Sequence, residues 1–144
     1  MGMLRAGADI VGYELREDFA DRARQNVEKF MGTEVLDRYR VELRDCYDGI
    51  DEVGVDRVIL DLPEPWNVVP HAEKALRPGG LILAYTPSVT QVMQLRGILE
   101  RSNFFAPQTI EVLQRGWYVE GQAVRPDHRM VAHTGFLTVA RLGA

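Results

Sequence analysis

The chain has 144 residues, which is enough for one domain built around one hydrophobic core. Apolar residues make up 46% of the sequence, a fraction that excludes disordered and fibrous classes, and no stretch approaches the roughly 18–20 consecutive apolar residues of a membrane span. The formal net charge of -4 argues against a protein that binds nucleic acid through bulk electrostatics. Cys46 is the only cysteine, so the chain can form no internal disulfide and no cysteine-based metal site. We expect a cytoplasmic protein.

The first third of the chain alternates between strand and helix patterns. A short apolar run at 10–13 predicts a buried strand that is closed by Glu14. Apolar residues at spacings near four then predict a helix that Asp18 caps and Gly32 ends; its stripe consists of Phe19, Ala20, Ala23, Val27 and Phe30. A second strand is expected at 39–43 and leads into Asp45.

The middle of the chain repeats this alternation. A third buried run at 57–60 ends at Asp61, and two prolines exclude regular structure from 63–66. We expect a helix at 67–76, a stop at 77–80 and a fourth strand at 81–85. Ser88 and Gln91 have the spacing of a capping box, which begins a helix whose buried side carries Val92, Leu95, Ile98 and Leu99.

The last third favours antiparallel strands, at 109–113, 117–124 and 135–141. Together with the upstream alternation, this pattern predicts the α/β class: a doubly wound parallel sheet, covered on both faces and finished by an antiparallel edge. In such sheets ligands bind outside the carboxyl ends of the strands.

Three acids occupy such strand ends. Glu14 has the position of a carboxylate that binds ribose hydroxyls, although a solvated acid that ends a strand is the more ordinary interpretation. Asp45 could meet the amine of an adenine ring, or form a turn before Asp48 and Gly49. Asp61 is more specific, because an acid followed by a proline-rich turn and an aromatic residue is typical of sites that methylate amino groups.

Other polar and aromatic residues admit two interpretations. Tyr85, at the end of the fourth strand, could stack on a flat base or cap the core. His133 could contact RNA, but a histidine at the start of a strand more often has a structural role. The three histidines have no metal-binding spacing, so we expect no metal. Cys46 lacks an activating pattern and is expected to be inert.

Several motifs together resemble the tRNA (adenine-N1)-methyltransferases. The segments that carry the resemblance are 12–20, 60–66, 84–92, 113–117, 124–126 and 133–137, and the most specific is Leu60-Asp61-Leu62-Pro63-Glu64-Pro65-Trp66. The resemblance implies a Rossmann-like class I methyltransferase fold that uses S-adenosyl-L-methionine and modifies adenine 58 in the T-loop of tRNA. It also implies a homo-oligomer, usually a tetramer, with no membrane association.

The resemblance implies roles for five side chains. Glu14 would bind the ribose of the cofactor, Asp45 would bind its adenine, and Phe19 would lie against it. Asp61 would lie next to the cofactor and position the target adenine, and Tyr85 would line the pocket for that base.

The family also has features that these 144 residues lack, namely a small β-rich N-terminal domain and a strand followed by a glycine-rich loop that holds the methionine part of the cofactor. We therefore expect residues 1–144 to be a partial methyltransferase domain that is truncated at its N-terminus, with a gap in its sheet and weak cofactor binding alone. Two alternatives remain. One is a non-catalytic fragment that contacts RNA or assembles through Arg115, Arg125 and Arg129, and the other is a methyltransferase of this fold with a small-molecule or protein substrate.

Overall fold

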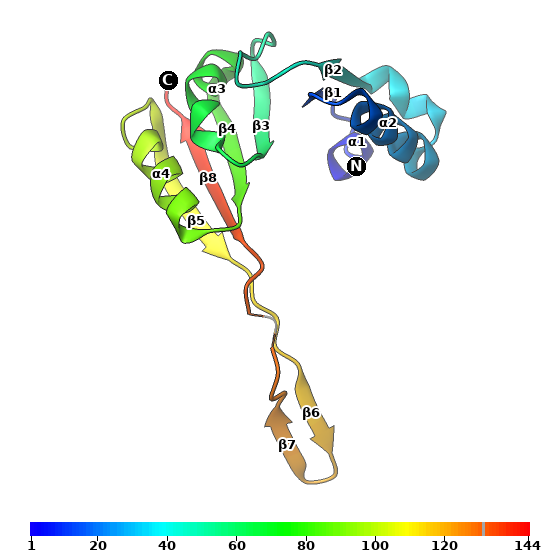
Figure 1. The fold of residues 1–144 in the computed structure, drawn as a ribbon, viewed down its shortest axis with the longest axis vertical. Helices are drawn as coiled ribbons and strands as arrows, with labels where there is room; N and C mark the ends of the chain where they lie inside the picture. Colours follow the sequence, from blue (N-terminus) through cyan, green and yellow to red (C-terminus); the bar gives the residue numbers. More distant parts are fainter. Residues whose placement is uncertain (131) are drawn as a thin grey trace. The chain divides into compact units, whose positions relative to one another are not determined.

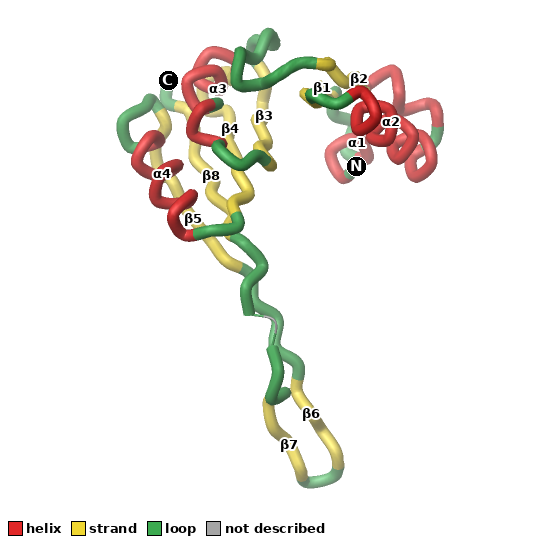
Figure 2. The backbone as a smooth tube through the Cα atoms, in the orientation of Figure 1, coloured by secondary structure: helices red, strands yellow, loops and turns green. Residues whose placement is uncertain are grey.

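The computed structural model describes residues 1–130 and 132–144. The chain divides into two compact units, Met1–Gly49 and Ile50–Ala144, and each is described by itself. Figure 1 labels the helices and strands, and Figure 2 colours the same trace by secondary structure. No helix among the described residues has both the length and the apolar character that crossing a bilayer requires.

The first unit packs helices against a parallel pair of strands. Strands β1 (Ile10–Glu14) and β2 (Tyr39–Leu43) pair in parallel, and the chain between them forms α2 (Glu17–Met31) and the 3-10 helix η1 (Thr33–Arg38). A short helix, α1 (Gly2–Arg5), precedes β1. Leu4, Val27 and Val35 form the core of this unit, so one side chain from each helical segment supports the strand pair.

Helix α2 differs in detail from the prediction. It begins after Arg16, and the Asp18 side chain does not cap it. As the second residue of the helix, Asp18 instead pairs with the Arg16 guanidinium at 2.7 Å. This hydrogen bond holds the pKa of the Asp18 carboxyl below its usual range. Gly32 ends the helix as predicted, with φ at +87°.

The apolar stripe of α2 is also narrower than predicted. Ala20 and Val27 are buried as expected, whereas Phe19 and Phe30 are exposed. Strand β1 is half-buried along its whole length instead of buried, because it pairs only with β2 among the described residues.

The second unit contains a four-stranded sheet in the order β3-β4-β8-β5. Its strands are β3 (Val55–Asp61), β4 (Leu76–Thr86), β5 (Phe104–Glu111) and β8 (Phe136–Leu142). β3 and β4 are parallel, while β8 runs antiparallel to both β4 and β5, which confirms the predicted antiparallel edge.

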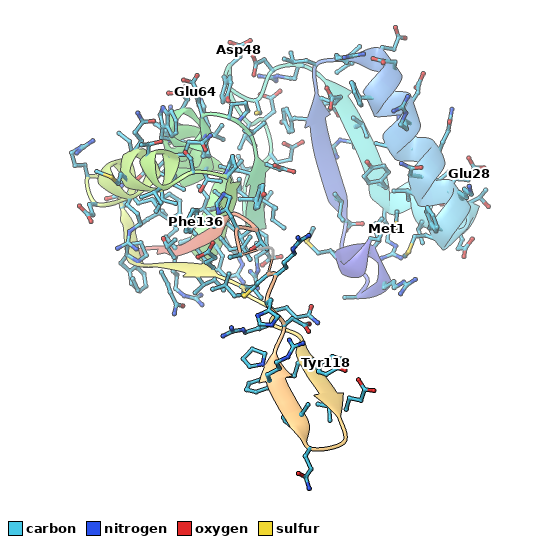
Figure 3. The ribbon with its side chains drawn as sticks, turned by 60° about the horizontal axis from the view of Figure 1, so that its bottom comes forward. Met1, Glu28, Asp48, Glu64, Tyr118 and Phe136 are labelled. Carbon is cyan, nitrogen blue, oxygen red and sulfur yellow. The ribbon has the colours of Figure 1, made fainter. Side chains whose placement is uncertain are left out.

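Two helices, α3 (Val69–Ala75) and α4 (Val89–Leu99), cover one face of this sheet (Figures 1 and 3). Alternate residues of β3, β4 and β8 are buried, among them Leu60, Ile82, Ala84 and Ala140, and Leu95 and Leu99 of α4 are buried too. The predicted capping box is present: the Gln91 amide donates to Ser88 Oγ at 3.3 Å, and the Ser88 amide donates to Gln91 Oε1 at 3.1 Å.

Several boundaries differ from the sequence prediction. Pro65 starts a short 3-10 helix, η2 (Pro65–Asn67), although the prolines led us to expect no regular structure there. The expected stop at 77–80 is an insertion within β4, because the pairing with β3 passes from Leu76 to Leu81. The strand expected at 117–124 is a hairpin of β6 (Trp117–Glu120) and β7 (Ala123–Pro126).

The expected parallel sheet is divided in two. Among the described residues β1 pairs only with β2, and β3 pairs only with β4, so no strand hydrogen-bonds the two sheets together.

Candidate active site

Two of the predicted site residues lie at one edge of the first unit's strand pair. Glu14 is the last residue of β1 and stands opposite Leu43, the last residue of β2. Asp45 follows two residues after Leu43. Because the two strands are parallel, Glu14 and Asp45 leave the same, carboxyl edge of the pair, as predicted for both.

Each of these carboxylates uses one oxygen to fix its own turn. The Arg16 amide donates to Glu14 Oε1 at 3.0 Å, and the Tyr47 amide donates to Asp45 Oδ1 at 2.8 Å. The turn-forming role considered for Asp45 is therefore present. Among the described residues no donor reaches the second oxygen of either carboxylate. Each side chain is thus oriented by its backbone and keeps one acceptor for a ligand.

Phe19 and Cys46 adjoin this edge in sequence. The Phe19 ring is exposed and carries the Arg16 guanidinium carbon 4.2 Å from its centroid. Burial raises the pKa of the Cys46 thiol, and the nearby Asp45 charge raises it further. The thiol therefore stays protonated at neutral pH, in agreement with the inert role expected for it.

The other two predicted site residues lie side by side in the second unit. Asp61 ends β3, Tyr85 lies near the end of β4, and the two are direct partners in the parallel register. Partners in a parallel pair project to the same face of the sheet, and both side chains are exposed. No described residue donates a hydrogen bond to the Asp61 carboxylate, which is therefore available to a ligand.

The turn after Asp61 is held in place from two sides. Gln91 Nε2 in the first turn of α4 donates to the Pro63 carbonyl at 2.8 Å, and Pro65 is fully buried. This is the proline-rich segment that sequence reasoning singled out, and its fixed path supports the orientation of Asp61. Figure 3 labels Glu64 in this turn.

Sequence reasoning missed the residues that hold Tyr85. The Tyr85 hydroxyl donates to the Thr134 carbonyl at 3.1 Å, and the ring lies against Gly135, whose φ is +93°. His133, which precedes them, contacts the Pro87 carbonyl and the Glu111 carboxylate. His133 and Gly135, just before the last strand, are the only sequence features that could have indicated this contact. No local spacing in the sequence links them to Tyr85.

The structure thus places Glu14 and Asp45 at one edge of the β1–β2 pair, and Asp61 beside Tyr85 in the β3–β4 register. The two pairs belong to different units, so their convergence on one cleft stays a prediction.

This fold is that of S-adenosylmethionine-dependent methyltransferases. A SAM-dependent O-methyltransferase from Thermotoga maritima superposes with a TM-score of 0.84 at 32% identity, over 94% of this chain and 50% of that one. The tRNA methyltransferase TrmI from Aquifex aeolicus superposes with a TM-score of 0.79 at 26% identity, over 94% of this chain and 54% of that one.

Within this class the chain belongs to the family described as tRNA methyltransferase complex GCD14 subunit, whose sequence profile matches residues 12–127. The tRNA (adenine(57)-N(1)/adenine(58)-N(1))-methyltransferase TrmI of Methanocaldococcus jannaschii is 35% identical over 92% of this chain and 55% of its own length. TrmI of Thermus thermophilus is 33% identical over 92% of this chain and 51% of its own length. The chain spans about half the length of these curated relatives. The family resemblance seen in the motifs is confirmed.

Proposed function

We propose that residues 1–144 form part of the catalytic domain of a tRNA (adenine-N1)-methyltransferase that transfers a methyl group from S-adenosylmethionine to N1 of adenine 58. The observation that carries this proposal is the pairing of Asp61 with Tyr85 at the carboxyl ends of two parallel strands, beside a fixed proline-rich turn. The names of the relatives from M. jannaschii and T. thermophilus support the substrate. A tRNA substrate also supports the expected cytoplasmic location.

The hydrogen-bond acceptors at the carboxyl ends of β1 and β2 fit the nucleoside part of the cofactor. Glu14 keeps one carboxylate oxygen for ribose hydroxyls, and Asp45 keeps one for an adenine amine. The exposed Phe19 ring offers an apolar surface nearby in sequence. When bound, S-adenosylmethionine supplies a methyl group on a positively charged sulfur.

The second pair of residues acts on the base that receives the methyl group. N1 of adenine carries a lone pair in the ring plane, so attack needs alignment and exclusion of water more than a strong base. In this role the Asp61 carboxylate accepts a hydrogen bond from the exocyclic amine of the adenine and thereby sets the direction of N1. The Tyr85 ring supports the flat base beside it.

Replacing Glu14 by alanine is expected to raise the KM for S-adenosylmethionine by about 10-fold or more and to leave kcat at saturating cofactor nearly unchanged. Ribose contacts are similar in the ground state and the transition state, so their loss weakens binding without slowing the chemical step. Steady-state kinetics with varied cofactor measure this split. Glu28→Ala, at the far end of α2, is the matched control and should leave both parameters unchanged (Figure 3). A Glu14→Ala variant with parental KM would remove Glu14 from the cofactor site.

The substrate class is tested with tRNA transcripts. We expect the protein, as its gene encodes it, to methylate an unmodified tRNA transcript and to lose this activity when uracil replaces the adenine at position 58. Methylation of the altered transcript at the same rate would exclude adenine 58 as the target. A steep decline in tRNA affinity with added salt would further separate an RNA substrate from a small molecule.

We also propose that the protein forms a homo-oligomer through the β6–β7 hairpin. Trp117, Val119 and Val124 are all exposed there, and Figure 3 shows the labelled Tyr118 on the same ribbon. A two-stranded hairpin is marginally stable alone, and its strand edges and apolar side chains favour a protein partner. Within β6 and β7, the face with Trp117, Val119 and Val124 carries no charged side chain, because Glu120 and Arg125 project from the opposite face, so the same apolar face of two copies can pack together about a two-fold axis.

The hairpin proposal predicts that Val119→Glu lowers the mass of the assembly in solution. A charge at the centre of an apolar interface must be buried without a partner, which opposes association. Val119 is 68% exposed, and Val53, which is 83% exposed in a loop, provides the matched control Val53→Glu. Light scattering after size-exclusion chromatography measures both variants. A parental mass for Val119→Glu would rule out the hairpin as the interface, and a monomeric parent would rule out the oligomer.

A further inference from the structure

The chain before β8 connects the ends of two strands that are far apart in sequence. Phe136, the first residue of β8 and labelled in Figure 3, pairs with Thr86 of β4 on one side and with Glu111 of β5 on the other. The three preceding residues, His133, Thr134 and Gly135, therefore lie where β4 and β5 both end. This segment lies in the same unit as Asp61 and Tyr85.

Tyr85 depends on this segment for its orientation. Its hydroxyl donates to the Thr134 carbonyl at 3.1 Å. A Cβ atom at Gly135 would lie 2.6 Å from Tyr85 Cζ and Oη, so the ring occupies space that only glycine leaves open. Glycine also adopts the observed φ of +93° without strain. The backbone at 134–135 thus sets both the tilt of the ring and the position of its hydroxyl.

The segment itself is held by side-chain contacts to both strand ends. His133 Nε2 lies 2.6 Å from the Pro87 carbonyl oxygen, and because a carbonyl only accepts, Nε2 carries the hydrogen. His133 Nδ1 lies 3.4 Å from Glu111 Oε1, and Thr134 Oγ1 donates to the Val112 carbonyl at 2.9 Å. The shorter His133 contact joins the segment to the chain that directly follows Tyr85.

We propose that His133 is a positioning residue for the methyl-accepting base: it holds the 133–135 segment against the end of β4, so that Thr134 and Gly135 fix Tyr85 in the base pocket. The inference rests on the proposed function, because it takes Tyr85 as the side chain that supports the base. His133 acts through Tyr85 and touches neither the cofactor nor the reacting nitrogen. It assigns a function to a histidine for which the sequence alone favoured a purely structural role.

The proposal predicts a specific pattern of kinetic effects. His133→Ala should lower kcat/KM for tRNA by about 10- to 100-fold, because small misplacements of a positioning group are costly. The KM for S-adenosylmethionine and the melting temperature should stay near the parental values, since His133 is exposed. His133→Gln should recover most of the loss, because its side-chain NH₂ can reach the Pro87 carbonyl as Nε2 does. His128→Ala, at another exposed histidine, is the control and should behave as the parent.

A double-mutant cycle tests whether His133 acts through Tyr85. If it does, adding His133→Ala to Tyr85→Phe should cost much less than it costs in the parent, because the hydroxyl that the segment holds is already absent. Full additivity of the two losses would overturn the proposal. The proposal would also be overturned if His133→Gln lost as much activity as His133→Ala, or if the loss of activity in His133→Ala came with a lowered melting temperature.

A readout without substrate separates this inference from the proposed function. With 3-fluorotyrosine incorporated, the ¹⁹F resonance that disappears in Tyr85→Phe belongs to Tyr85. His133→Ala should shift and sharpen that resonance as the ring gains freedom, and His128→Ala should not. A parent that fails to methylate tRNA would refute the proposed function, while an unshifted Tyr85 resonance in His133→Ala would refute the positioning role whatever the substrate is.

Discussion

Replacing Asp61 by alanine should lower the rate of tRNA methylation by at least about 100-fold and leave the fold intact. The carboxylate ends β3, is exposed and accepts no hydrogen bond from any described residue, so its removal opens no cavity and leaves no buried donor without a partner. Its expected contribution is to orient the adenine that receives the methyl group. The reaction requires this orientation, and folding does not. The measurement is single-turnover methylation of unmodified tRNA at saturating cofactor, with thermal melts of each variant.

The opposite end of the same strand supplies the control. Asp56 is an exposed carboxylate of β3 whose partner is the Arg77 guanidinium at 2.6 Å. Asp56→Ala removes a surface ion pair, which should change stability little and methylation not at all. Near-normal turnover in Asp61→Ala, or a melting temperature far below that of the parent, would make Asp61 a structural residue and remove it from the site.

Ile82→Ala should lower the free energy of unfolding of the second unit by about 2–5 kcal/mol. Ile82 is 2% exposed in the middle of β4, between β3 and β8, and its truncation leaves a cavity under α3 and α4. Both tryptophans of the sequence, Trp66 and Trp117, belong to this unit, so their fluorescence follows its unfolding in urea. The loss of stability should lower the urea concentration at the unfolding midpoint and leave the dependence of the unfolding free energy on urea (the m-value) unchanged.

Met93 on α4 is the control for this truncation. It is similar in size to Ile82 but 68% exposed, so Met93→Ala should change stability by less than about 0.5 kcal/mol. Equal losses at Ile82 and Met93 would contradict the assignment of β4 as the centre of the core.

The sequence predicted the strands that carry the site because their signals are local. A short apolar run followed by an acid identified the ends of β1 and β3, and the strand expected at 39–43, leading into Asp45, is β2. The capping box of α4 was predicted for the same reason, since Ser88 and Gln91 are only three residues apart.

Long-range contacts could not be predicted in this way. The Tyr85 hydroxyl meets a carbonyl 49 residues later in the chain, and no periodicity connects the two. The spacing of apolar residues also did not show that Phe19 and Phe30 are exposed, whereas Ala20 and Val27 of the same helix are buried. Residues on both sides of Gly121 prefer strands, so the sequence predicts one continuous strand at 117–124. In the structure Gly121, with φ at +55°, lies in the turn that makes this segment a hairpin.

The position of the transferred methyl group tests the central claim most directly. Unmodified tRNA is incubated with S-adenosylmethionine and the protein as its gene encodes it, then digested to nucleosides for mass spectrometry and, in parallel, probed by reverse transcription. The account predicts N1-methyladenosine, a reverse-transcription stop at position 58, and the loss of both with Asp61→Ala. A methyl group on another atom or nucleotide, or no methylation of tRNA by a folded protein that binds S-adenosylmethionine, would contradict it.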